Sequence, residues 1–506
     1  MSQSRGSPGT GSGPGQQARA QLEKADYLRR QGQLDRAESI CFELTRRYPD
    51  YVAALHTLGL VHLDRHSFQR ALDCLIRAQM LDPDNWMILT ALGLTYMRLG
   101  APEMAARSLG QALASRPGEA SIFASLGDLY RNEYDYKRAE DAYRNALKLD
   151  GSLESSEVGL ALCLSALGRH AQAAKVLEDA FRHGHCSLSL FSAMASLPHK
   201  TLSIDLLRAL DLLAARQRTQ DAEFTNTFAF ARAAALHNVG RYSEAWNQLE
   251  AANRTLFAQY KAQIRDDIAR QERSLARLRG VPQRPPVAGR NPLTLFILGP
   301  SRSGKSSLEL LLSSRDGVTR GDEAPIAAAA LRRVYQASAV PAIGDFDNLS
   351  SDLYPLFRDC YVDEITRRAG SARVLTSALS DHVHHASTIA SLIPNVRFVL
   401  MRRNPQDTAL RMYMSKYLRG NAYAYDLKSI AEYLAWYETM IELFAQKYAD
   451  ISIVVTYENM LADPSATLNK VTGFAGLSTG DRPKPELVDD RDVAEPYKSL
   501  MRQDLP

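Results

Sequence analysis

The residues best suited to chemistry form one short phrase near the middle of the chain. Residues 299–306 read Gly-Pro-Ser-Arg-Ser-Gly-Lys-Ser, follow the apolar run 293–298 and precede a helical pattern. A strand, a glycine-bearing loop and a helix in this order are typical of a phosphate-binding loop, because backbone N–H groups and the helix N-terminus converge on one anion. We therefore predict a phosphate site in this loop. Gly304 would let the backbone approach the phosphate, Arg302 or Lys305 would supply a cation, and the hydroxyls of Ser306 and Ser307 would donate hydrogen bonds.

A second cationic feature follows another strong strand pattern. The apolar run 396–401 leads directly into Arg402 and Arg403, where a Walker-type ATPase needs a carboxylate for Mg²⁺. Arginine at a strand end can clamp a second phosphate bidentately, and a nucleotide with phosphates at two ends needs two anion sites. Alternate strand positions face opposite ways, so we expect Arg402 to point outward or to form an ion pair. Glu458 lies two residues after the apolar run 451–456 and is the one candidate for a Walker-type acid, which leaves a Mg²⁺-dependent, NTP-binding P-loop enzyme as an alternative.

The composition limits the classes of protein to consider. The 506 residues contain 61 Lys and Arg against 57 Asp and Glu, a formal net charge of +4, which argues against a polyanion-seeking protein and predicts no nucleic-acid partner. The 5 cysteines are scattered, form no disulfide framework and fit a reducing compartment. No apolar run reaches the ~20 residues that span a bilayer, and the N-terminus lacks the apolar core of a secretory signal. We therefore expect a soluble, cytoplasmic protein.

A repeated pattern occupies the first half of the chain. Gly59, Gly93 and Gly127 are 34 residues apart, and alanines follow each glycine at matching positions. The pattern resembles the tetratricopeptide repeat (TPR), in which small residues let two helices cross closely while large apolar residues fill the remaining positions. The resemblance implies a solenoid with a concave surface for a peptide, glycan or lipid-like acceptor or for a protein partner. A purely structural scaffold is the alternative.

The changes of pattern along the chain set the predicted domain order. We predict a disordered tail at 1–17, TPR-like helical repeats at 18–279, a proline-rich linker at 280–292 and a P-loop domain at 293–506. The predicted fold is an all-α TPR superhelix followed by a three-layer α/β domain with a parallel sheet. No metal site is predicted, because no zinc-ligand spacing is matched by the loose cluster of His183, His185, Cys186 and His199.

Three motifs in the second half resemble the sulfotransferase family in its repeat-fused form. They read FILGPSRSGKSSLELLLSS with a following GDE, then NVRFVLMRRNPQDTALRMYMSKY, then YENMLADPSATLNKVTGFAGL, in the order expected for that family. The resemblance covers most of residues 220–478. It implies transfer of a sulfuryl group from the co-substrate 3′-phosphoadenosine 5′-phosphosulfate to a hydroxyl or amine, with no metal required.

The resemblance also implies roles for individual residues. Arg403 would grip the 3′-phosphate, and Arg302 and Lys305 would stabilise the leaving phosphate. Glu323, in the phrase Gly-Asp-Glu-Ala-Pro, matches the general base of the tyrosyl-protein branch of the family. Two alternatives stay open: Asp322 is the base instead, or Glu323 only stabilises a helix N-terminus. The loop for the 5′-phosphosulfate would consist of Arg302, Ser303, Gly304, Lys305, Ser306 and Ser307.

Several positions depart from the family pattern, all at the predicted donor site. Arg411 stands where the family usually has a serine that shares the 3′-phosphate; an arginine can still bind phosphate, with a different reach. Residues 377–380 replace an expected Asp-Lys-x-Pro phrase, and the segment after Gly476 lacks a tryptophan-containing closing motif. A catalytically degenerate, sulfotransferase-like TPR scaffold for protein interactions is therefore a further alternative.

Overall fold

The computed structural model of the chain forms two compact units, residues 1–163 and 164–506. Within the described residues, no helix is long and apolar enough to cross a membrane. The structure describes residues 15–198, 201–216, 222–280, 289, 291–338, 349–417, 421–477 and 485–501, apart from the side chains of Arg216 and Gln336. Outside the described residues lie residues 1–14 of the predicted tail, residues 281–288 and 290 of the predicted linker, and His199.

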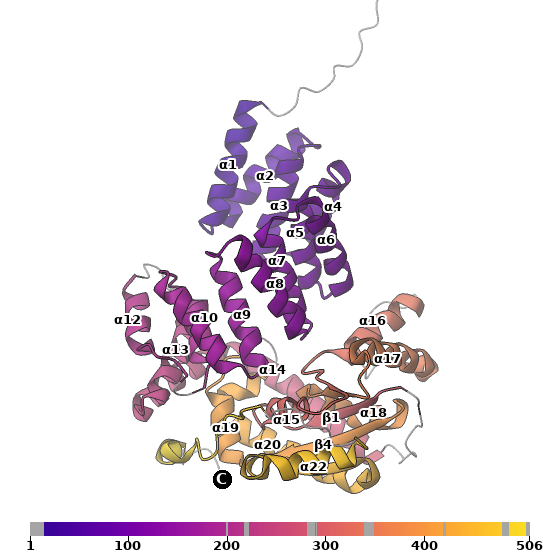
Figure 1. Cartoon of the computed structure of the whole chain (residues 1–506). Coiled ribbons are helices and arrows are strands. Elements are labelled where there is room, and N and C mark those ends of the chain that lie inside the picture. Colours follow the sequence, from indigo (N-terminus) through magenta and orange to yellow (C-terminus); the bar gives the residue numbers. More distant parts are fainter. Residues whose placement is uncertain are drawn as a thin grey trace, which may run out of the picture. The chain divides into compact units, whose positions relative to one another are not determined.

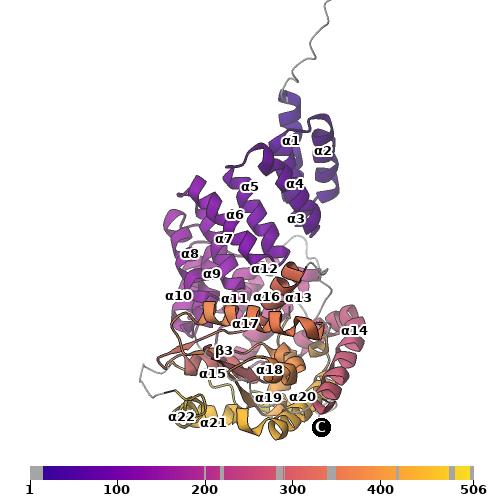
Figure 2. The same ribbon diagram turned by 90° about the vertical axis from the view of Figure 1, so that its right-hand side faces the viewer.

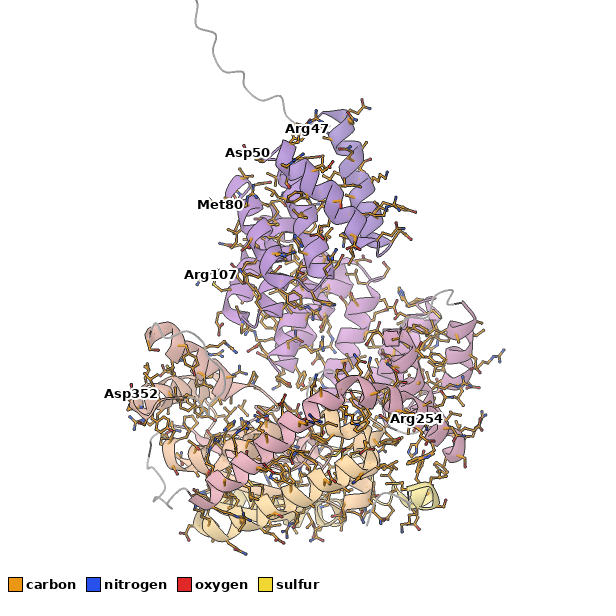
Figure 3. All side chains as sticks on the ribbon, turned by 180° about the vertical axis from the view of Figure 1, so that it is seen from behind. Arg47, Asp50, Met80, Arg107, Arg254 and Asp352 are labelled. Atoms are coloured by element: carbon orange, nitrogen blue, oxygen red, sulfur yellow. The ribbon has the colours of Figure 1, made fainter. Side chains whose placement is uncertain are left out.

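The first unit consists of consecutive helices that pack in pairs (Figure 1). Side chains such as Met80 and Arg107 project from these helices into solvent (Figure 3). The helices are α1 (Gln16–Arg30), α2 (Leu34–Arg47), α3 (Val52–Asp64), α4 (Phe68–Leu81), α5 (Trp86–Arg98), α6 (Pro102–Ser115), α7 (Ala120–Asn132) and α8 (Tyr136–Leu149), followed by α9 (Glu154–Ala166), in which the boundary between the units falls.

Small residues bring the two helices of each pair close together. A β-carbon at Gly59 would lie 2.7 Å from Cγ of Leu75 on the following helix, and Gly93 and Gly127 have equivalent surroundings. Such a distance leaves no room for a side chain, so glycine fixes how closely the helices cross. The repeated alanines are completely buried: Ala71, Ala78, Ala105, Ala112, Ala139 and Ala146. The predicted close crossing at these positions is confirmed.

The second unit begins with further helices, of which the last packs on the α/β domain. They are α10 (His170–Arg182), α11 (Leu188–Ala195), α12 (Leu206–Arg216), α13 (Ala222–Asn238) and α14 (Tyr242–Gly280). α14 is 39 residues long. From this helix, Asn253 Nδ2 donates to Tyr413 O at 2.9 Å. The indole N–H of Trp436 donates to Gln271 O at 3.1 Å, so α14 is bound to the α/β domain at two points along its length.

Five parallel strands form the sheet, in the order β2-β3-β1-β4-β5. β1 is buried along its whole length, as expected for a central strand of a sheet with two covered faces. β1 and β4 pair from Thr294↔Val396 to Leu298↔Leu400, so their carboxyl ends lie side by side. The strands are β1 (Leu293–Leu298), β2 (Val318–Thr319), β3 (Val374–Ser377), β4 (Val396–Arg402) and β5 (Ser452–Thr456).

Helices cover both faces of this sheet. On one face, Leu308 of α15 (Lys305–Leu312) and Leu468 of α22 (Pro464–Phe474) share a core with Leu295. On the other face, the ring centroid of Phe398 lies 4.8 Å from that of Phe444, on α20 (Leu427–Lys447). The predicted fold class, a TPR array followed by a three-layer α/β domain with a parallel sheet, is confirmed.

The remaining helices lie around the sheet. α17 packs on α16 and lies beside β3 (Figure 2). These helices are α16 (Ile326–Ser338), α17 (Tyr354–Ala369), α18 (Ala386–Leu392), α19 (Pro405–Tyr413), α21 (Tyr457–Ala462) and α23 (Lys498–Met501).

Candidate nucleotide-binding site

The loop between β1 and α15 has a backbone suited to an anion. Gly304 has φ +94°, and a β-carbon there would lie 2.3 Å from Cδ2 of Tyr457, so the position requires glycine. Arg302 has φ 64°, a left-handed conformation that is uncommon outside glycine and recurs at functional turns. α15 begins at Lys305, directly after the loop, so its unpaired N–H groups and its dipole face the loop. The loop therefore offers several backbone donors to one ligand.

Lys305 is turned back onto this loop. The side chain is buried, and Nζ donates to the carbonyl oxygens of Gly299 and Pro300, each at 2.8 Å. Burial lowers the pKa of the Lys305 ammonium to about 8, and the carboxylate of Glu323 opposes this shift. The charge of this cation is therefore sensitive to pH just above neutrality.

The other predicted loop ligands differ in exposure. Arg302 and Ser306 are exposed and Ser307 is half-buried, whereas Ser303 is completely buried. Among the described residues, Oγ of Ser303 has no hydrogen-bond partner. An unpaired buried hydroxyl costs roughly 1–3 kcal/mol, so a ligand that bonds it would remove an existing penalty.

At the carboxyl end of β4, two neighbouring arginines serve different purposes. Arg402 forms an ion pair with Glu438 of α20, as expected for its outward position. Arg403 faces the loop: its Nη1 donates to Arg302 O at 2.9 Å, and its guanidinium carbon lies 4.4 Å from the ring centroid of Tyr457. Because neighbouring strands are ~4.8 Å apart, the loop after β1 and Arg403 after β4 form two adjoining cationic ends of one site.

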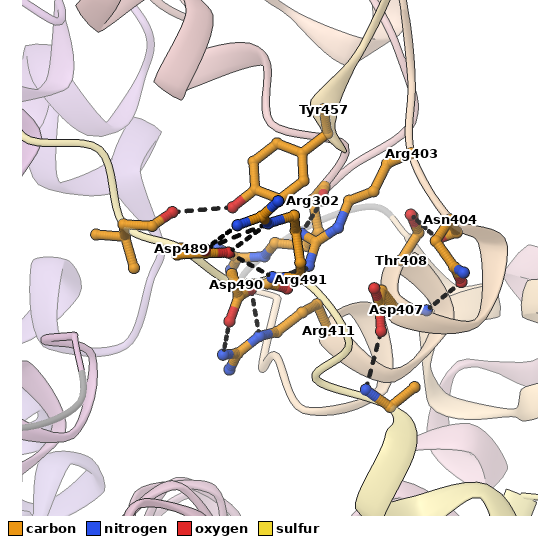
Figure 4. A network of polar contacts seen from close by, with 12 residues as sticks. Arg302, Arg403, Asn404, Asp407, Thr408, Arg411, Tyr457, Asp489, Asp490 and Arg491 are labelled. Atoms are coloured by element: carbon orange, nitrogen blue, oxygen red, sulfur yellow. Dashed lines mark hydrogen bonds and ion pairs between the residues drawn. The ribbon is translucent and has the colours of Figure 1, made fainter. Parts of the chain in front are cut away.

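A carboxylate already contacts the β4 end (Figure 4). Arg411, on α19, binds Asp490 bidentately through Nε, at 2.6 Å, and Nη2. Nη2 of Arg403 lies 3.2 Å from Oδ2 of the same carboxylate. The side chain of Arg403 is only 4% exposed, against 28% for Arg411 and 19% for Asp490. The structure thus brings the predicted ligands Arg403 and Arg411 together around Asp490, which was not among the predicted site residues.

Residues 485–494, which we call the strap, are fixed to the α/β domain on both sides of Asp490. The hydroxyl of Tyr457 donates to the carbonyl oxygen of Val488 at 3.0 Å. The buried carboxylate of Asp407 accepts two N–H groups of the strap, at 3.0 and 2.9 Å. Asp407 is therefore a structural anchor, held at the start of α19 next to the β4 end.

The two candidate bases, Glu323 and Asp322, have different environments. Glu323 lies in the turn before α16 and is exposed, and among nearby charges its carboxylate has the largest effect on Lys305. Asp322 is buried and forms an ion pair with Arg320, and burial raises its pKa. Glu323 is therefore the carboxylate that an incoming acceptor could reach.

A further acid lies beneath the loop. Glu309, on α15, is completely buried and accepts a hydrogen bond from Oγ1 of Thr376 at 2.5 Å. Burial, and then repulsion from Asp322, raises the pKa of Glu309. Holding this group neutral keeps negative charge away from the anion site. Its only sequence signal is a lone glutamate within the apolar first helix after the loop.

Glu458, the candidate Walker-type acid, lies away from the loop strand. It follows β5, which is an edge strand separated from β1 by β4. Its carboxylate accepts the backbone N–H of Asn404 at 2.8 Å. The strands that flank β1 end at Ser377 and Arg402. No group of three or more His, Cys, Asp or Glu suited to a metal ion is found in the described part of the chain.

Comparison with protein families finds matches in part of each half of the chain. A profile of the sulfotransferase family matches residues 292–481, and profiles of the tetratricopeptide repeat match residues 88–121 and 120–152. The chain therefore joins tetratricopeptide repeats to a domain of the sulfotransferase family, as its motifs predicted.

Similar proteins include tetratricopeptide repeat protein 21B of Homo sapiens, 28% identical over 176 residues, and BBSome complex member BBS4 of Bos taurus, 28% identical over 95 residues. The alignments cover 34% and 19% of this chain, and 13% and 18% of those relatives. The chain thus spans less than a fifth of the length of either relative.

Similar solved structures include a thermophilic TPR protein of Thermus thermophilus, with 22% identity and a TM-score of 0.34, and a TPR protein of Parabacteroides merdae, with 18% identity and a TM-score of 0.36. These alignments cover 35% and 47% of this chain, and 97% and 93% of those chains.

Proposed function

We propose that the protein is a sulfotransferase that moves a sulfuryl group from 3′-phosphoadenosine 5′-phosphosulfate to a hydroxyl or amine acceptor. The observation that carries this proposal is the pair of adjoining cationic ends, at the loop after β1 and at Arg403 after β4, in a domain of the sulfotransferase family. Phosphates on the 5′ and 3′ positions of one ribose require two neighbouring anion sites.

The residues present fit the two ends of this co-substrate. The loop N–H groups, the buried hydroxyl of Ser303 and the cations Arg302 and Lys305 suit the 5′-phosphosulfate. Two arginines, Arg403 and Arg411, suit a phosphate at the other end, because their N–H groups can bind it bidentately. Asp490 accepts from both of these arginines, so a phosphate that binds there has to take the place of its carboxylate.

Catalysis would depend on positioning and charge, because sulfuryl transfer, like phosphoryl transfer, passes through a loose transition state. Glu323 would take the proton of the acceptor hydroxyl or amine while the acceptor atom bonds to sulfur. The bond from sulfur to the 5′-phosphate oxygen breaks, and that oxygen keeps the electron pair. Arg302, Lys305 and the N–H groups of the loop would stabilise the negative charge on the departing phosphate.

The TPR array would serve as the acceptor or partner surface. Each repeat exposes one face of a helix pair, and stacked repeats form extended binding surfaces. The five cysteines are all unpaired, which suits a reducing compartment, and we place the protein in the cytoplasm on this ground.

Calorimetric titration of the full chain with adenosine 3′,5′-bisphosphate, the expected product, tests the proposal. We expect saturable binding at one site in the presence of EDTA. No detectable binding by the folded protein would contradict it. ATP binding that requires Mg²⁺ and is lost in Glu458→Ala would instead support the NTP-binding alternative.

A catalytically degenerate scaffold is the second candidate, favoured by one observation. The carboxylate of Asp490 neutralises part of the charge of Arg403 and Arg411, the pair proposed to hold the 3′-phosphate. A protein that has lost the donor needs such an internal partner for a buried arginine. This candidate predicts that the bisphosphate fails to bind both the wild type and any variant at Asp490.

A further inference from the structure

At the β4 end of the site, the carboxylate of Asp490 occupies the position in which the proposed function requires the 3′-phosphate of the nucleotide. Oδ2 of Asp490 accepts from Nε of Arg411 at 2.6 Å and lies 3.2 Å from Nη2 of Arg403. Backbone oxygen of the same aspartate also accepts from Arg403. Asp490 therefore accepts hydrogen bonds from both of the guanidinium groups that a phosphate would otherwise bind.

The strap is also held at points other than this carboxylate. Tyr457 holds it at Val488, on one side of Asp490, and Asp407 holds two N–H groups on the other side. Asp489, the preceding residue, contacts Arg491 within the strap. The side chain of Asp490 can consequently leave the arginines while both anchors remain in place.

The two arginines keep donor capacity that Asp490 does not use. Nε of Arg403 is buried and has no hydrogen-bond partner among the described residues. A carboxylate has two oxygens and one negative charge, whereas a phosphate has three acceptor oxygens and a charge of about −1.5 to −2 at neutral pH. A phosphate can therefore bind the Arg403 and Arg411 pair more completely than Asp490 does.

We propose that Asp490 is an internal competitor that occupies the second anion site until the 3′-phosphate of a nucleotide displaces its carboxylate. This inference rests on the proposed function. A nucleotide without that phosphate gains nothing from the arginines, since the Asp490 contacts stay intact. The competition thus makes the site selective for ligands with a second phosphate and lowers their affinity below what the arginines alone would give.

The test is a comparison of Asp490→Asn with Asp489→Asn in the full chain, by calorimetry with adenosine 3′,5′-bisphosphate and with adenosine 5′-monophosphate. Asp490→Asn keeps the shape of the side chain and removes its charge. We expect it to bind the bisphosphate about tenfold more tightly and the monophosphate with unchanged affinity. Asp489→Asn is the matched control, and we expect wild-type affinity for both nucleotides.

Each outcome bears on the proposal in a defined way. Equal or weaker bisphosphate binding by Asp490→Asn, with binding by the wild type, overturns the competition and leaves the proposed function standing. If the bisphosphate binds neither the wild type nor Asp490→Asn, both the competition and the proposed function are overturned.

A second variant covers the case in which Asp490→Asn does not fold. Asp490→Ser also removes the carboxylate, and the strap keeps its bonds to Tyr457 and Asp407. We expect this variant too to bind the bisphosphate more tightly than the wild type and the monophosphate with unchanged affinity. Bisphosphate binding no tighter than that of the wild type would overturn the competition.

Discussion

The two ends of the candidate site hold positive charge in different ways. At the loop end, Lys305 is buried among carbonyl oxygens with a lowered pKa, and Arg302 is exposed. At the β4 end, Arg403 and Arg411 are permanently charged and contact an internal carboxylate. The loop end can therefore respond to pH above neutrality, whereas the β4 end can respond to competition by another anion.

The largest expected effect belongs to chemistry at the loop end alone. Glu323→Gln removes the proposed base without changing the size of the side chain, so we expect release of labelled sulfate from 3′-phosphoadenosine 5′-phosphosulfate to water to fall about 100-fold or more. Bisphosphate affinity should change only a few-fold, because Glu323 contacts neither arginine of the β4 end and affects the loop end through the charge of Lys305. Sulfate release at the wild-type rate would show that Glu323 only supports the start of α16.

A change of pH should have a smaller effect on nucleotide affinity, and this effect should come from the loop end. Because burial lowers the pKa of Lys305 to about 8, the ammonium loses its proton as pH rises through this value, and an anion at the loop binds more weakly. The buried Glu309, whose pKa burial raises to about 8, loses its proton over the same range and acts in the same direction. Between pH 7 and pH 9.5 we expect affinity for adenosine 5′-monophosphate and for the bisphosphate to fall by the same factor, about tenfold.

Lys305→Met is the control for this pH dependence. The variant should bind both nucleotides more weakly at pH 7 and lose most of the fall in affinity at higher pH, since Glu309 still titrates there but Lys305 is gone. A pH profile identical to that of the wild type would show that Lys305 does not contribute its charge to the ligand.

Much of the architecture follows from short-range patterns in the sequence. The 34-residue spacing of Gly59, Gly93 and Gly127 predicts helix pairs. The prediction succeeds because each glycine contacts one large side chain of the next helix in the chain. The strand-loop-helix phrase around Lys305 and the outward position of Arg402 also follow from local periodicity. In each case the cause and its effect lie within one or two neighbouring elements.

Contacts over long sequence separations could not be predicted in this way. Asp490 lies 79 residues beyond Arg411 in the chain and has no motif of its own, so no spacing rule joins the two. Asn253 of α14 binds the backbone of Tyr413, 160 residues further along the chain. The sequence pattern places this helix in the predicted repeat region 18–279 and gives no sign of that contact. Such pairs depend on the tertiary fold, which the local pattern does not specify.

The most direct measurement of a two-ended site compares Arg302→Ala, Arg403→Ala and the control Arg402→Ala with two nucleotides. We expect Arg403→Ala to weaken adenosine 3′,5′-bisphosphate by about 30-fold or more while leaving adenosine 5′-monophosphate unchanged. Arg302→Ala should weaken both nucleotides, and Arg402→Ala, whose side chain pairs with Glu438, should weaken neither. Equal losses for both nucleotides in Arg403→Ala, or no loss in either, would contradict a second phosphate site at the end of β4.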